Sequence, residues 1–140
     1  MKYRYYGDRL LVRLDRGEEV MASLLSLAEK ENIRLASVQG IGAADQACLG
    51  VYDLKERVFR PNDFSGVYEI TSLLGSIDRL NGKPRLHLHM NIADSEGRAY
   101  GGHLNSARIS ITCEIMLTLL PGTAERTLDE ETGIYIWDFD

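Results

Sequence analysis

The sequence has little cysteine, no long apolar run and no excess of positive charge, and each shortage excludes something. The two cysteines, Cys48 and Cys113, lie far apart and form no Cys-x-x-Cys motif. We therefore expect a reduced, cytoplasmic protein in which both act as small apolar side chains. The longest apolar run near the C-terminus, residues 115–120, is too short to span a bilayer. The N-terminus has no apolar stretch of signal-peptide length, so no membrane partner is expected.

The charge balance argues against a protein that binds nucleic acid on its own. Lys and Arg total 16 and Asp and Glu total 21, which gives a net charge of −5 and an isoelectric point near 5.2. Proteins that bind nucleic acid on their own usually carry a basic patch and a high isoelectric point. Direct DNA binding is therefore not expected from composition.

The size and apolar content indicate one folded unit. The chain has 140 residues, of which 44% are hydrophobic and 26% are charged. This excludes disordered and fibrous classes. The length allows one full hydrophobic core and is too short for two ordinary domains, so we expect a single domain over residues 1–140.

The hydrophobic pattern predicts one main helix and about seven or eight strands. Residues 18–32 carry apolar side chains at helical spacing, with Glu18 and Glu19 expected in the first turn. Short turns join most of the strand-like segments, so we expect an α+β protein with a mainly antiparallel central sheet. A short helical turn is expected at residues 127–131. The expected strands cover residues 9–14, 33–38, 47–54, 57–60, 68–77, 85–92, 98–119 with a bend, and 134–139.

All three histidines fall in two short segments that a hairpin can bring together. His87 and His89 are two residues apart on an expected strand, so both leave the same face. If residues 94–97 form a type I turn with Gly97 in the left-handed conformation, Asp94 pairs with Arg98 and His89 lies opposite His103. Cβ atoms of such pairs are roughly 4.5–5.5 Å apart. Three neutral imidazoles suit zinc and leave a fourth position for water or a ligand. The alternative is three unrelated surface histidines.

This register requires an irregularity in the second strand. The apolar residues from Ala107 to Leu119 share the parity of His103, although they belong in the core. A bulge, expected near Asn105 and Ser106 or at Gly101 and Gly102, would change the face.

Two glutamates are candidate general bases beside a metal, Glu69 and Glu114, although such residues are more often solvated strand positions. A two-residue turn at Asn81 and Gly82 would place Glu69 on the face away from the histidines. The same turn would place Ser72 and Ser76 on the histidine face.

Taken together, the motifs resemble the plants-and-prokaryotes conserved (PPC) domain over nearly the whole chain. The resemblance is carried by residues 16–20 (RGEEV), 40–43 (GIGA), 66–75 (GVYEITSLLG), 84–89 (PRLHLH) and 101–104 (GGHL). It implies a fold with a central, mainly antiparallel sheet, assembled as a homotrimer. It also implies a zinc site at His87, His89 and His103. Prokaryotic members are often labelled DNA-binding, but the chain lacks the Arg-Gly-Arg-Pro hook that precedes the domain in plants.

Three functions remain open at this point. The first is a trimeric zinc-binding module for ligand sensing or assembly. The second is a DNA-associated regulatory protein, and the third is a zinc-dependent hydrolase or lyase that uses a metal-bound water. A concave pocket with a carboxylate near the metal would favour the enzyme, and a basic stripe would favour DNA.

The C-terminal strand also points to assembly, with one alternative. Tyr135, Trp137 and Phe139 share one face, while Ile134 and Ile136 share the other. A strand that is apolar on both faces is usually covered on both. Either another subunit covers it, or Trp137 packs under Val20 and Leu24 of the helix.

Overall fold

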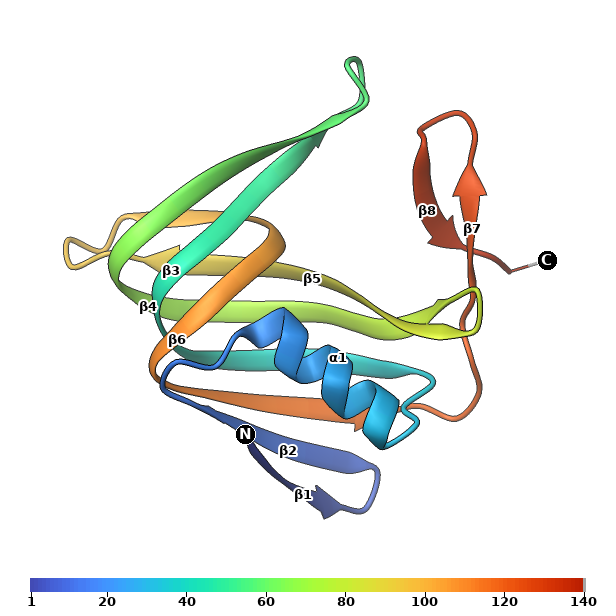
Figure 1. Cartoon of the computed structure of the whole chain (residues 1–140), viewed down its shortest axis with the longest axis horizontal. Coiled ribbons are helices and arrows are strands. Elements are labelled where there is room, and N and C mark those ends of the chain that lie inside the picture. The colour runs from blue at the N-terminus through green and yellow to red at the C-terminus, as the bar shows by residue number, and fades with distance from the viewer. Residues whose placement is uncertain (140) are drawn as a thin grey trace.

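The structure of the protein, a computed structural model that describes residues 1–139, contains eight strands and one helix (Figure 1). In chain order these are β1 (Lys2–Tyr6), β2 (Arg9–Asp15), α1 (Val20–Lys30), β3 (Ala36–Asp53), β4 (Val58–Leu80), β5 (Lys83–Ala93), β6 (Ala99–Leu119), β7 (Arg126–Asp129) and β8 (Ile134–Trp137).

Six strands form one antiparallel sheet in the order β1-β2-β6-β3-β4-β5, and β6 also pairs with β5. The extra pairing closes β6, β3, β4 and β5 into a ring. β7 and β8 form a separate hairpin. The mainly antiparallel sheet with a single helix confirms the predicted fold class.

The helix begins two residues later than predicted because Glu19 caps it. The Glu19 carboxylate accepts hydrogen bonds from the backbone N–H of Met21 at 3.0 Å and of Ala22 at 2.6 Å. It also accepts one from Ala107 at 3.0 Å, which ties the start of α1 to β6. No helix within residues 1–139 is long and apolar enough to cross a membrane.

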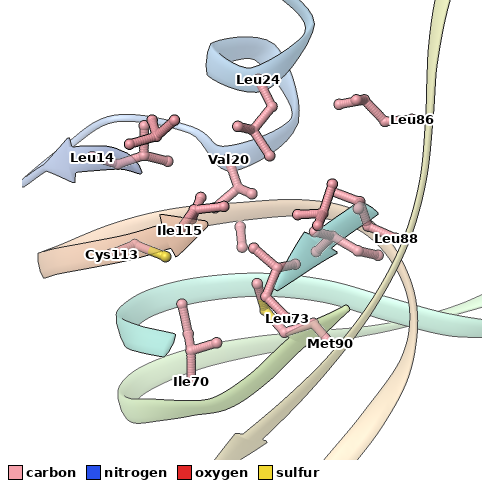
Figure 2. Close-up of a cluster of buried hydrophobic side chains, with 14 of the residues drawn as sticks. Leu14, Val20, Leu24, Ile70, Leu73, Leu86, Leu88, Met90, Cys113 and Ile115 are labelled. Carbon is pink, nitrogen blue, oxygen red and sulfur yellow. The ribbon is translucent and has the colours of Figure 1, made fainter. Parts of the chain in front are cut away.

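The core lies between α1 and the sheet. The buried face of α1 consists of Val20, Leu24, Leu27 and Ala28. In Figure 2, Val20 and Leu24 point toward apolar side chains of the strands. On β5 the buried side chains are Leu86, Leu88, Met90 and Ile92, as the alternation predicts. We call the sheet surface opposite this core the outer face.

Several strands continue where the sequence predicts a stop. β3 runs through Gly40 and Gly42 with register shifts rather than ending there. β4 runs through Pro61, which pairs with Gly50. Pro61 is tolerated because β4 has only one neighbour there, since its pairing with β5 begins at Glu69. The expected helical turn at residues 127–131 is wrong: Arg126–Asp129 is strand β7, held by β8. β1 was not anticipated.

The predicted bulge in β6 lies at Asn105. Leu49 pairs with Leu104 and Cys48 with Ser106, so Asn105 is the extra residue. The bulge changes which face the alternate side chains of β6 occupy. Leu104 and Ala107, which lie on either side of it, are therefore both buried. A second irregularity, opposite Gly42 and Ala44, turns Ile111 outward, where it is 69% exposed, so Ile111 does not join the core.

A close approach between β4 and β5 depends on Gly75. Its φ is +155°, and a Cβ there would lie 1.9 Å from the carbonyl oxygen of His87. No side chain fits at this distance, so Gly75 sets how closely β4 supports the histidine strand.

We expect Gly75→Ala to destabilise the protein by more than about 3 kcal/mol, because the strand that carries His87 must move. Gly7→Ala is the matched control, since Gly7 also has a positive φ but open space around its Cβ position. The control should cost about 1–2 kcal/mol. Urea unfolding measures both, and equal losses would show that the β4–β5 approach is not the constraint.

Candidate metal centre

The β5–β6 hairpin brings the three histidines together in the predicted register. His89 pairs with His103, and Asp94 accepts a hydrogen bond from Gly97 N–H at 2.9 Å. The Asp94 N–H donates to the Arg98 carbonyl at 3.1 Å, and Gly97 has a φ of +77°. This is the turn that the sequence predicts. His87 and His89 leave the outer face of β5 beside His103.

The rings form a nearly equilateral triangle. Ring centroids are 5.3 Å apart for His87 and His89, 5.2 Å for His87 and His103, and 5.5 Å for His89 and His103. An ion bound to three imidazoles at about 2.0–2.1 Å would place the centroids about 5 Å apart. One nitrogen from each ring lies within 4.8 Å of the others. Binding would draw these atoms to about 3.3 Å, which ring rotation can supply. The donor set and the spacing fit a metal ion.

Burial keeps two of the rings neutral. His87 and His103 are partly buried, and His89 is exposed. Burial, together with the positive charge of Arg126, lowers the pKa of His87 to about 4. Burial, together with the charges of His89 and Arg85, lowers the pKa of His103 below its usual value. Both are thus in the form that binds metal at neutral pH, because only the deprotonated imidazole nitrogen is a ligand.

Neighbouring side chains hold two of the rings. The Phe59 ring meets His103 edge-on, with centroids 5.9 Å apart. Nη2 of Arg126 lies 3.3 Å from Nδ1 of His87. Because a guanidinium only donates, Nδ1 accepts this bond and the ring proton lies on Nε2. A metal ion would therefore either bind Nε2 and displace its proton, or bind Nδ1 in place of the hydrogen bond from Arg126.

Arg126 is itself fixed by a buried ion pair. Its Nε and Nη2 donate to the Asp78 carboxylate at 2.7–3.0 Å, and the two side chains are 5% and 0% exposed. Trp137 Nε1 donates to the same carboxylate at 2.9 Å, and Ser76 Oγ at 3.0 Å. Asp78 therefore has well-satisfied oxygens, which is the condition under which a buried charge is tolerated.

The β7–β8 hairpin also reaches the far end of β3 and β4. The far ends of β3 and β4 extend past the neighbouring strands of the sheet, and the β7–β8 hairpin extends in the same direction (Figure 1). Tyr52 Oη donates to the Thr132 carbonyl at 3.1 Å. Nη2 of Arg57 donates to the carbonyls of Glu130 and Glu131 at 3.2 and 2.8 Å. These contacts fix the position of the hairpin that carries Arg126.

The candidate general bases do not join the histidines. Glu114 lies on β6, where it pairs with Arg13 and with Ile41, and β3 and β4 separate this part of β6 from the histidine strand β5. Glu69 pairs with Ala93, four residues along β5 from His89. The pairing register of β4 with β5 shifts by one residue at Thr71, and this places Glu69 on the outer face with the histidines. The expectation that Glu69 lies on the face away from the histidines is therefore wrong. Ser76 does lie opposite His87, as predicted.

Sequence reasoning missed the support around the histidines. The sequence analysis did not single out Asp78, Arg85, Arg126 or Phe59 as site residues. Trp137 bonds Asp78 and stacks over Arg126, with the guanidinium carbon 5.4 Å from the ring centroid. It is therefore not a side chain packed under Val20 and Leu24. An available signal was the predicted hairpin turn at Asn81 and Gly82, which places Asp78 opposite Arg85.

Comparisons with known proteins identify the family and the fold of the chain. The sequence model of the Plants and Prokaryotes Conserved (PCC) domain matches residues 1–121. A crystal structure from Bacteroides thetaiotaomicron, described as a "putative DNA binding protein", is 28% identical, with a TM-score of 0.96 over 99% of this chain and 96% of that chain. A protein from Archaeoglobus fulgidus described as metal-containing is 33% identical, with a TM-score of 0.88 over 98% of this chain and 99% of that chain.

One curated relative is much longer than this chain. The bifunctional protein GlmU of Synechococcus sp. (strain JA-3-3Ab) is 32% identical over 116 residues, which cover 81% of this chain and 17% of that protein. The chain thus spans about a sixth of its length, and the likeness concerns that part alone.

We expect Asp78→Asn to destabilise the protein by about 3–5 kcal/mol, because it leaves the Arg126 charge buried without a counter-ion. Asp45→Asn is the control, since Asp45 forms an exposed pair with Arg108, and it should cost less than about 1 kcal/mol. Chemical unfolding measures both changes. A similar, small cost for both variants would contradict the assigned role of the buried pair.

Proposed function

The chain belongs to the Plants and Prokaryotes Conserved domain family, and from this premise we propose that it is a homotrimeric module that binds zinc through His87, His89 and His103. A small ligand would bind at the fourth coordination position of the ion, which the protein leaves open. The observation that carries the proposal is the convergence of all three histidines of the chain on one face of the β5–β6 hairpin.

Zinc is the metal that the ligand chemistry favours. Three imidazoles are borderline donors, and three protein ligands with an open fourth position are typical of zinc sites that bind water or substrate. A bound zinc ion would supply a Lewis acid and a water of lowered pKa. The metal-containing relative from Archaeoglobus fulgidus supports a metal at this site.

A ligand-binding role has more support than hydrolysis. A hydrolase needs a free base near the metal-bound water. Within residues 1–139, the carboxylate that the contacts tie to the site is Asp78, and Arg126, Trp137 and Ser76 already occupy it. Among the described residues 1–139, no free carboxylate forms a hydrogen bond with the rings, and this supports ligand binding over hydrolysis.

DNA association is the second candidate, favoured by the description of the Bacteroides thetaiotaomicron relative. Non-specific DNA affinity comes largely from Lys and Arg that neutralise phosphates, and the net charge of this chain is −5. If the protein acts on DNA, an indirect role through a partner fits this charge better than a direct contact.

Exposed apolar side chains on the sheet support self-association. Leu11, Ile41, Leu74 and Met116 are 36–60% exposed and line a hollow of about 860 Å³. A contiguous apolar surface of this kind marks an interaction site. Leu74 pairs with His89, so the hollow borders the histidines. The choice of three subunits rests on the family resemblance.

We expect His103→Ala to lose zinc while the fold persists, because His103 is a ligand on the outer face and not part of the core. The loss of affinity should exceed the tenfold to hundredfold that loss of an outer-shell partner costs. Metal analysis of protein purified without an affinity tag measures occupancy. Asn91→Ala, two residues beyond His89 on the same face of β5, should keep its zinc. Full occupancy in His103→Ala would remove that residue from the site.

The proposed trimer predicts a mass of about three times 15.7 kDa by light scattering. Ile41→Asp should lower this mass, since a charge on the apolar hollow opposes its burial between subunits. Leu25→Glu, at an exposed position of α1, should leave the mass unchanged. A monomer of the native chain at micromolar concentration would overturn the trimer, and a trimer of Ile41→Asp would move the interface elsewhere.

A further inference from the structure

Arg85 carries a positive charge on the same strand face as the histidines. Arg85, His87 and His89 stand at alternate positions of β5, so their side chains leave the sheet in one row. Arg85 is partly exposed, yet its Nη1 atom is buried and has no hydrogen-bond partner. An unsatisfied guanidinium nitrogen costs free energy, which an arriving acceptor would recover.

The nearby carboxylate is not available to Arg85. Asp78 lies opposite Arg85 in the β4–β5 register. Its oxygens accept instead from Arg126, from Trp137 and from Ser76. Two guanidinium groups thus stand beside the histidines with one carboxylate between them. The group has a surplus of one positive charge before any metal binds.

The charge of Arg85 reaches the histidine rings. After burial, the largest cause, the charge of Arg85 contributes to the lowered pKa of both His87 and His103. Arg126 acts in the same direction on His87. A metal cation at the rings would add to this positive potential, which an anion would relieve.

We propose that Arg85 is an anion-binding residue of the metal centre and that the ligand is a small monoanionic carboxylate, held by Arg85 and by the open position of the ion. This assignment rests on the proposed metal site and specifies the ligand class for it. Arg85 offers one guanidinium group beside the ion, and guanidinium groups bind carboxylates through charge-assisted hydrogen bonds.

The test uses the full chain loaded with Co²⁺, whose visible spectrum reports changes at the metal. Lactate, a small carboxylate with a second oxygen donor, is titrated into the native protein and into Arg85→Gln. Lactate should shift the native spectrum, and the variant should bind it about tenfold to hundredfold more weakly. Arg34→Gln is the control, because Arg34 is exposed and two residues from β3, and its affinity should equal the native value.

The remaining outcomes separate the alternatives. Equal lactate affinity in Arg85→Gln, with Co²⁺ bound at full stoichiometry, overturns the role of Arg85 and leaves the metal site standing. Phosphate binding more tightly than lactate overturns the carboxylate assignment. A native chain that binds no Co²⁺ overturns both proposals.

Two further measurements exclude a structural role for Arg85. Arg85→Lys keeps the charge and loses the planar fork, so it should bind lactate with an affinity between those of the native chain and Arg85→Gln. Light scattering should give the same mass for all variants. A lower mass for Arg85→Gln would show that the guanidinium pairs with another subunit, which would overturn the ligand role.

Discussion

The pairing of His89 with His103 across the β5–β6 hairpin is the contact on which the rest of the site depends. A shift of one residue would turn His103 toward the core and Leu104 toward solvent, because strand side chains alternate between faces. The turn at residues 94–97 sets the pairing, and the extra residue Asn105 returns the apolar residues of β6 to the core. The bulge therefore lets one strand contribute both to the core and to the candidate metal centre.

The second constraint is the buried ion pair that joins the C-terminal hairpin to the site. Arg126 arrives from β7, and Asp78 lies on β4, 48 residues earlier. Between them they place a fixed positive charge beside His87, which favours its neutral form. Arg85 adds a second positive charge, and its buried Nη1 atom has no hydrogen-bond partner. The candidate site thus combines three nearby histidines with a positive surround, an environment that suits the proposed anionic ligand.

The features that depend on residues close together in the chain could be predicted from the sequence. The alternation of β5 and the turn chemistry at Asp94 and Gly97 give the histidine face, the register and the need for a bulge. Long-range packing decided the rest. β3 and β4 continue through glycines and Pro61 because neighbouring strands support them, and residues 127–131 form a strand because β8 pairs with them. The Asp78–Arg126 pair joins distant segments, which no local pattern reveals.

The most direct test of the account is X-ray absorption spectroscopy of the zinc-loaded protein, which counts the imidazoles on the ion. We predict three imidazole nitrogens at about 2.0–2.1 Å, with the remaining coordination made up by oxygen. Sulfur in the first shell, or fewer than three imidazoles, would contradict the convergence of His87, His89 and His103 on one ion.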